Sequence, residues 1–122
     1  MQEINNDQPV SIVIANYNGK KYLDVCLRSV LKSKYPNFEL LITDDGSIDE
    51  SIKIINSYIK KDKRIRLFKN KKNIGAAASR NIAIKKAKGE IIVFLDNDTE
   101  VHPNWLNELV KTLGNDKQIG GA

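Results

Sequence analysis

The segment with the clearest chemical potential is an apolar run that ends in two carboxylates one residue apart. Residues 91–95 are Ile-Ile-Val-Phe-Leu, and Asp96, Asn97 and Asp98 follow them directly. Such a run is typical of a strand buried on both faces of a parallel sheet. Two neighbouring carboxylates repel each other unless a cation or a hydrogen-bond donor compensates. A hard divalent cation such as Mg²⁺, shared with substrate phosphates, would do so. A helix cap or an Asx-turn would use the same residue types and stays open.

Length and polarity bound the class of protein. The chain has 122 residues, 41% of them hydrophobic, which suffices for one globular domain. It has no apolar run of about 18 residues, so we expect no membrane-spanning helix. Residues 1–9 are polar and lack a signal-peptide core, and we expect them to form a disordered tail. We therefore expect a cytoplasmic protein, with the inner face of the membrane as an alternative location.

Charge and cysteine content exclude further classes. The net charge is +5, and lysines cluster in residues 60–64 and 69–72. No aromatic side chains interleave these clusters, so we interpret them as a solvated surface and expect no nucleic-acid partner. The single cysteine, Cys26, excludes an intrachain disulfide and a Cys-based zinc site. Its helical spacing from neighbouring apolar residues favours a buried structural thiol.

Strands and helices are expected to alternate along the chain. We predict strands at residues 10–15, 38–43, 64–68 and 91–95, and helices over 20–33, from about 48, over 74–86 and from 103. This alternation predicts an α/β fold, with a parallel sheet covered by helices on both faces, and a single domain over residues 10–122. Ser47 to Glu50 has the form of a capping box, which would start the second helix near Ile48 and bury that side chain.

Polar segments follow three of the predicted strands, and they occupy residues 16–18, 44–47 and 96–98. The carboxyl ends of parallel strands share one edge of a sheet, where ligands bind. Tyr17 offers an aromatic face on which a base could stack. Asp45 could accept from a base N–H or from ribose hydroxyls. Arg80, which follows a run of small residues, could direct its guanidinium toward a base or a phosphate.

Two common phosphate-binding loops are excluded by the residues after the first strand. A Rossmann dinucleotide site requires Gly-x-Gly-x-x-Gly there, but residues 15–19 contain one glycine. The Gly-Lys-Ser/Thr end of a P-loop does not occur in the chain. A metal ion on Asp96 and Asp98 is therefore the expected clamp for a diphosphate.

The sequence resembles the family 2 glycosyltransferases with the GT-A fold. The resemblance rests on four motifs in the family's order, at residues 10–18, 44–49, 73–81 and 89–98. It implies a Rossmann-like half-domain in which Tyr17 and the backbone near Ala15 line a base pocket. It also implies that Asp45 recognises the base, commonly uracil, and that Arg80 lies near the base or the diphosphate. We expect Asp45 to matter for nucleotide binding while contributing little to the fold.

The remaining implications of the resemblance concern catalysis. Asp96 would contact the ribose, and Asp96 and Asp98 would hold the Mg²⁺ or Mn²⁺ that bridges the diphosphate. The expected reaction is inverting transfer from a nucleotide-diphospho-sugar, with a UDP-sugar the expected donor, to a saccharide or lipid-linked acceptor in cell-surface polysaccharide synthesis. No residue matches the family's catalytic base, which we expect beyond Ala122 in an acceptor-binding half. In this chain Ala15 and Asn16 replace the family's usual Pro-Thr or Pro-Ser pair.

Other functions stay open at this point. A sugar-phosphate nucleotidyltransferase would share the parallel sheet, but it requires a glycine-rich basic loop that residues 16–21 do not supply. A non-catalytic nucleotide-binding domain remains a further alternative. We also expect an unfinished sheet edge near Ile119 to promote self-association.

Overall fold

The computed structural model describes residues 7–115, in which strands and helices alternate as predicted. The elements are β1 (Val10–Asn16), α1 (Lys20–Leu31), β2 (Phe38–Asp44), α2 (Ser51–Lys61), β3 (Ile65–Lys69), α3 (Ala76–Lys86), β4 (Ile91–Asp96) and α4 (Trp105–Asn115). The strand predicted to begin near Ile119 lies outside the described residues.

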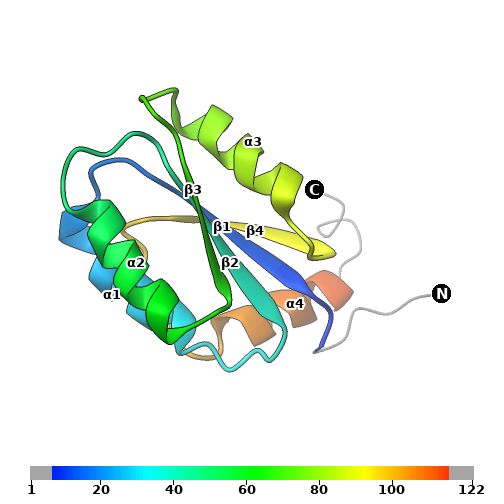
Figure 1. The fold of residues 1–122 in the computed structure, drawn as a ribbon. Coiled ribbons are helices and arrows are strands. Elements are labelled where there is room, and N and C mark those ends of the chain that lie inside the picture. Colours follow the sequence, from blue (N-terminus) through cyan, green and yellow to red (C-terminus); the bar gives the residue numbers. More distant parts are fainter. Residues whose placement is uncertain (1–6, 116–122) are drawn as a thin grey trace.

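The four strands form one parallel sheet in the order β3-β2-β1-β4. β1 lies in the interior, where Val10 pairs with Phe38 of β2 and with Ile91 of β4. Figure 1 shows α3 on one face of the sheet and α1, α2 and α4 on the other. The predicted α/β architecture, with helices on both faces of a parallel sheet, is confirmed, and its strands all end along one edge.

The two faces of the sheet bury different amounts of apolar surface. The face under α1, α2 and α4 carries the larger core, which includes Ile12, Leu27 and Leu106. The face under α3 carries a small cluster around Val13, Leu41 and Ala83. Cys26 belongs to the larger core, and burial raises the pKa of its thiol to about 11. This agrees with the interpretation of Cys26 as a structural thiol.

The expectation that residues 91–95 are buried on both faces is wrong. Among residues 7–115, β4 forms an edge of the sheet, and α3 lies over β1 and β2 rather than over β4. Val93 points into the larger core, whereas Phe94, on the other face, is 51% exposed. An apolar run therefore indicated a strand here but did not show how many of its faces are covered.

The predicted capping box at Ser47 does not form. α2 begins at Ser51, three residues later than expected, and Ile48 is 89% exposed. The Ser47 hydroxyl donates to Asp44 instead of capping a helix, at 2.7 Å. The backbone N–H of Ser51 donates to Asp49 Oδ1 at 2.8 Å, so an Asx-type contact leads into α2. The fourth helix likewise begins at Trp105, two residues after the predicted start at residue 103.

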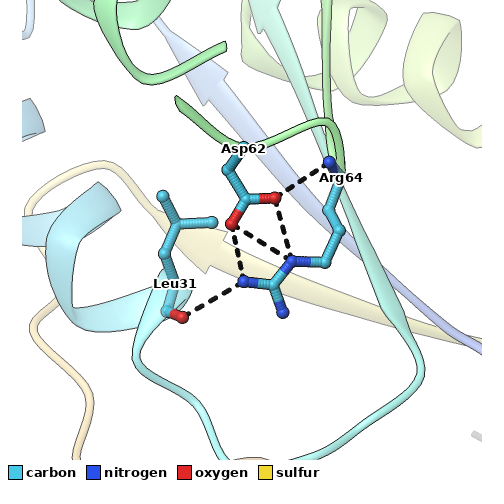
Figure 2. A network of polar contacts seen from close by, with 3 residues as sticks. All are labelled: Leu31, Asp62 and Arg64. Carbon is cyan, nitrogen blue, oxygen red and sulfur yellow. Dashed lines mark hydrogen bonds and ion pairs between the residues drawn. The ribbon is translucent and has the colours of Figure 1, made fainter. Parts of the chain in front are cut away.

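Arg64 directly precedes β3 and lies at the end of the sheet remote from these polar loops. Its side chain connects this end of the sheet to α1 and α2. Its guanidinium donates to both carboxylate oxygens of Asp62, at 2.6 to 3.2 Å, and to the carbonyl oxygen of Leu31 at 3.2 Å (Figure 2). Asp62 caps the end of α2 and Leu31 ends α1. The hydrogen bonds from Arg64 lower the pKa of Asp62. Through its contacts to Asp62 and Leu31, Arg64 connects the ends of α2 and α1 to the start of β3.

Residues 7–9, which we assigned to a disordered tail, contact the domain. The carbonyl oxygens of Asp7, Gln8 and Pro9 accept hydrogen bonds from Asn37, Tyr35 and Glu90, respectively. Residues 1–6 lie outside the described residues. Within residues 7–115, no helix is long and apolar enough to cross a membrane.

Candidate functional site

The loops that follow β1 and β2 and the segment that leads into α3 surround a pocket of about 340 Å³. Its lining consists of Ala15, Asn16, Tyr17, Asp45, Asn73, Gly75 and Ala76. The fold thus brings together three of the residues selected from the sequence, Ala15, Tyr17 and Asp45. Tyr17 is half exposed and lines this pocket, so it offers an aromatic ring to a flat ligand.

Asp45 is the anchor of the loop that leads into α3. Asp45 is only 3% exposed. Its Oδ1 accepts from the backbone N–H of Ile74 at 2.8 Å and from the Asn70 amide at 3.0 Å. Its Oδ2 accepts from the N–H of Gly75 at 2.9 Å. Gly75 precedes the first residue of α3, so the carboxylate also faces the positive end of the helix dipole.

These contacts correct the expectation that Asp45 contributes little to the fold. Burial alone would raise the pKa of its carboxyl group, but the hydrogen bonds from Ile74, Asn70, Gly75 and Ser79 outweigh burial and lower it. A lowered pKa in the folded state means that ionised Asp45 stabilises the fold at neutral pH. That stabilisation is lost as the pH falls through the lowered value. Asp45 therefore shapes the pocket as well as lining it.

Gly75 has a backbone conformation that an L-residue rarely adopts. Its φ is +100°, and a Cβ built on it would meet no atom within 4 Å. The requirement for glycine is therefore conformational rather than steric. This turn presents the N–H groups of residues 74 and 75 to Asp45.

Asp44 holds the loop after β2, as expected. Its carboxylate accepts from Asn16 Nδ2 at 3.0 Å, from the Ser47 hydroxyl at 2.7 Å and from the Ser47 N–H at 2.9 Å. Asn18, which has a positive φ of 51°, donates its N–H to Ser47 Oγ at 2.8 Å and accepts from the N–H of Ile48 at 2.9 Å. The loops after β1 and β2 are thus one hydrogen-bonded unit.

Arg80 lies on α3 and faces the end of β4. Its guanidinium Nη2 is 3.7 Å from Asp96 Oδ1, and its Nε is buried without a hydrogen-bond partner in the described structure. The two side chains are 38% and 75% exposed, so the pair contributes little to stability. Arg80 therefore keeps donors available beside the carboxylates at the end of β4, although it does not line the pocket itself.

Asp96 and Asp98 are the residues that the sequence predicts as ligands of a hard divalent cation. Asp96 ends β4 and Asp98 lies in the turn after it; both residues are exposed, and their carboxylates offer oxygen donors, which Mg²⁺ and Mn²⁺ prefer. Among residues 7–115 there is no group of three or more His, Cys, Asp or Glu side chains that could hold a metal. The chemistry of two neighbouring carboxylates suits a cation that would take its remaining ligands from substrate phosphates and water.

Some lining residues were not selected from the sequence. Asn73, Gly75 and Ala76 belong to the segment that leads into α3, and they reach the pocket because Asp45 holds that segment in place. Asn16 was identified only as part of the polar segment after the first strand, without a role of its own. Its position as the last residue of a central strand was the signal that could have marked it as a buried polar group at the site.

Comparison with known proteins identifies the family. The sequence matches the model of glycosyl transferase family 2 over residues 11–121. This chain belongs to glycosyl transferase family 2. The resemblance found in the four sequence motifs is thereby confirmed, and membership in this family argues against a sugar-phosphate nucleotidyltransferase.

Two bacterial relatives illustrate the family. An uncharacterized glycosyltransferase of Haemophilus influenzae is 45% identical over 115 residues, covering 87% of this chain and 46% of that protein. Glycosyltransferase GlyG of Streptococcus pneumoniae is 38% identical over 100 residues, covering 82% of this chain and 33% of that protein. This chain therefore spans less than half the length of either relative.

Solved structures of other proteins show the same fold. TarS of S. aureus in complex with UDP superimposes with a TM-score of 0.81 at 28% identity, over 88% of this chain and 32% of TarS. A second TarS structure contains UDP-GlcNAc. The mannosyltransferase PcManGT of Pyrobaculum calidifontis, solved with GDP-Man and Mn²⁺, gives a TM-score of 0.85 over 93% of this chain and 34% of that chain. At 22% identity, that likeness concerns the GT-A fold alone.

Proposed function

We propose that this chain is the donor-binding part of a glycosyltransferase that uses a nucleotide-diphospho-sugar, with UDP-sugar as the donor class. The observation that carries the proposal is the pocket at the carboxyl edge of the sheet, which combines Tyr17, Asp45 and the turn before α3. The TarS complexes with UDP and UDP-GlcNAc support it, because TarS shares this fold and 28% of the aligned sequence.

The base is assigned to the pocket and the diphosphate to the end of β4. Tyr17 would stack on the base. Asp45 Oδ2 accepts one protein N–H, whereas Oδ1 accepts two, and we assign Oδ2 to an imide N–H of uracil. Arg80 would donate to the base or the diphosphate, and the backbone of Ala15 would border the base. Asp96 would also accept from ribose hydroxyls.

Asp96 and Asp98 would hold Mg²⁺ or Mn²⁺ together with the diphosphate oxygens. When bound, the cation stabilises the negative charge on the leaving diphosphate. In the inverting transfer that we propose for the whole protein, an acceptor hydroxyl attacks the anomeric carbon as the bond to the diphosphate breaks. The hydroxyl proton passes to a carboxylate base. We assign that base, and the contacts to a saccharide or lipid-linked acceptor, to residues beyond Ala122.

Titration of the chain with UDP, with and without Mn²⁺, tests the proposal. Without a cation, Asp96 and Asp98 face the diphosphate with like charge, so we expect UDP to bind at least about tenfold more weakly in EDTA than in saturating Mn²⁺. Such a factor corresponds to about 1.4 kcal/mol. Isothermal titration calorimetry measures both affinities, with Mg²⁺ as a second cation. Equal affinity in EDTA and Mn²⁺ would remove the metal from the proposal, and absence of UDP binding under both conditions would reject the nucleotide site.

The chain of 122 residues by itself is expected to bind the donor without transferring sugar, and to self-associate through the β4 edge. Within residues 7–115, β4 ends the sheet, and its exposed Phe94 borders the open edge. Sedimentation velocity over a concentration series should detect the association, and product analysis with candidate acceptors should detect only slow donor hydrolysis. A monomer at all concentrations would contradict the expected self-association. Rapid sugar transfer would contradict the expectation that this chain does not transfer sugar.

A further inference from the structure

The buried side chain of Asn16 connects two parts of the candidate site. Asn16 ends β1 and is 1% exposed. Its Nδ2 donates to Asp44 Oδ1 at 3.0 Å and to Ser47 Oγ at 3.4 Å. Its Oδ1 accepts from Asn97 Nδ2 at 2.9 Å. Because the Asp44 carboxylate only accepts, it fixes the orientation of the Asn16 amide, and the Asn16 oxygen is left facing Asn97.

Asn97 is the residue between the two carboxylates at the end of β4. Its side chain donates inward to Asn16, whereas Asp96 and Asp98 on either side of it are exposed. Both amides pack against Gly19, where a Cβ would lie 2.2 Å from Asn16 Oδ1 and 2.3 Å from Asn97 Nδ2. The backbone of Gly19 has φ −91° and ψ 20°, which other residues also adopt. Glycine is therefore required here for space, so that the two amides can meet.

We propose that Asn16 and Asn97 are positioning residues that hold the turn of Asp96 and Asp98 in the conformation that binds the cation with the diphosphate. The inference deepens the proposed function and rests on it. A turn with two exposed carboxylates would otherwise sample many conformations, since the carboxylates repel each other. The hydrogen bond to Asn16 connects this turn to Asp44, because Asn16 also donates to Asp44. The residue after Asp44 is the pocket residue Asp45. The nucleotide and metal parts of the site are thereby held in one register.

Substitutions on both sides of this contact test the inference in the full chain. Asn97→Ala removes the donor from an exposed turn. Gly19→Ala leaves both amides in place but inserts a methyl group between them. Asn56→Ala removes the same side chain from the exposed surface of α2 and serves as the matched control. Calorimetry gives the affinity for UDP in EDTA and the affinity for Mn²⁺ in the presence of UDP, and thermal melting monitors the fold.

We expect Asn97→Ala and Gly19→Ala each to lower Mn²⁺ affinity about tenfold, the usual scale for residues that orient metal ligands. Affinity for UDP in EDTA should stay within about twofold of wild type, as should both affinities of Asn56→Ala. A merely structural contact would instead weaken UDP binding equally with and without Mn²⁺, and that outcome would overturn the inference. Unchanged Mn²⁺ affinity in both variants would also overturn it.

The wild-type measurement separates this inference from the proposed function. If wild-type UDP binding does not respond to Mn²⁺, the metal role of Asp96 and Asp98 fails, and the positioning role fails with it. If the wild type responds and the two variants respond equally well, only the positioning role fails. Should one variant melt below the temperature of the titration, the other still tests the same contact, because the two changes lie on different segments of the chain.

Discussion

Replacing Asp45 by asparagine is expected to lower the free energy of unfolding by about 2–3 kcal/mol, the scale of hydrogen bonds to a charged group. The buried carboxylate accepts from the N–H groups of Ile74 and Gly75 and from the amide of Asn70. In the variant, the new amide nitrogen would face one of these donors, so a buried polar contact is lost and replaced by repulsion. Urea denaturation followed by circular dichroism measures the change, and UDP affinity should fall with it.

The pH dependence of stability provides a second measurement of the same change. The hydrogen bonds lower the pKa of Asp45 in spite of its burial, so its contribution is complete above the ordinary aspartate pKa of about 3.9 and is lost as the pH falls below that value. The difference in stability between wild type and Asp45→Asn should therefore shrink in acid. A difference below about 0.5 kcal/mol at neutral pH, the scale of an exposed substitution, would contradict the anchoring role.

Replacing Asp98 by asparagine should have the opposite profile. Asp98 is exposed beyond the end of β4, so the free energy of unfolding should change by less than about 0.5 kcal/mol. Loss of one charged ligand should cost about 2–3 kcal/mol of UDP binding in saturating Mn²⁺, which is roughly a 30- to 150-fold decrease in affinity. In EDTA the variant should bind UDP at least as well as the wild type, because one repelling charge has been removed.

Calorimetry in both buffers measures this effect, and Glu108→Gln on the exposed surface of α4 serves as a control of equal charge change. Retention of wild-type affinity in Mn²⁺ by Asp98→Asn would show that the cation is held elsewhere. The two substitutions should thus affect different measurements. Asp45→Asn should lower both the stability and the UDP affinity, whereas Asp98→Asn should lower only the UDP affinity in Mn²⁺.

The alternation of elements could be predicted because strand and helix periodicities are local properties of the sequence. The convergence of polar loops at one sheet edge followed from the parallel topology, and this placed Tyr17 and Asp45 at one pocket. The start of α2 could not be predicted from its capping-box pattern. The Ser47 hydroxyl could either cap the helix or bond to Asp44. In the folded chain it donates to the carboxylate of Asp44, at the end of β2.

Burial was the other property that local sequence did not determine. Phe94 belongs to an apolar run, yet its exposure depends on the place of β4 in the strand order and on the position of α3. The structural role of Asp45 was also hidden, because its hydrogen-bond donors come from residues 70–79, which are remote in the sequence. Both properties depend on tertiary contacts that neither residue type nor spacing encodes.

The central place of β1 in the sheet has a consequence for the order of folding. β1 meets β2 by joining residue 10 to residue 38, but it meets β4 by joining residue 10 to residue 91. Closing the longer loop costs more chain entropy, so β4 should be the last strand to dock. Pulse-labelling hydrogen exchange during refolding should protect the amides of β2 before those of β4, and simultaneous protection would contradict this order. The pocket of Tyr17 and Asp45 would then form before the turn of Asp96 and Asp98 is fixed, so the proposed contacts to the base would be in place before the proposed metal ligands.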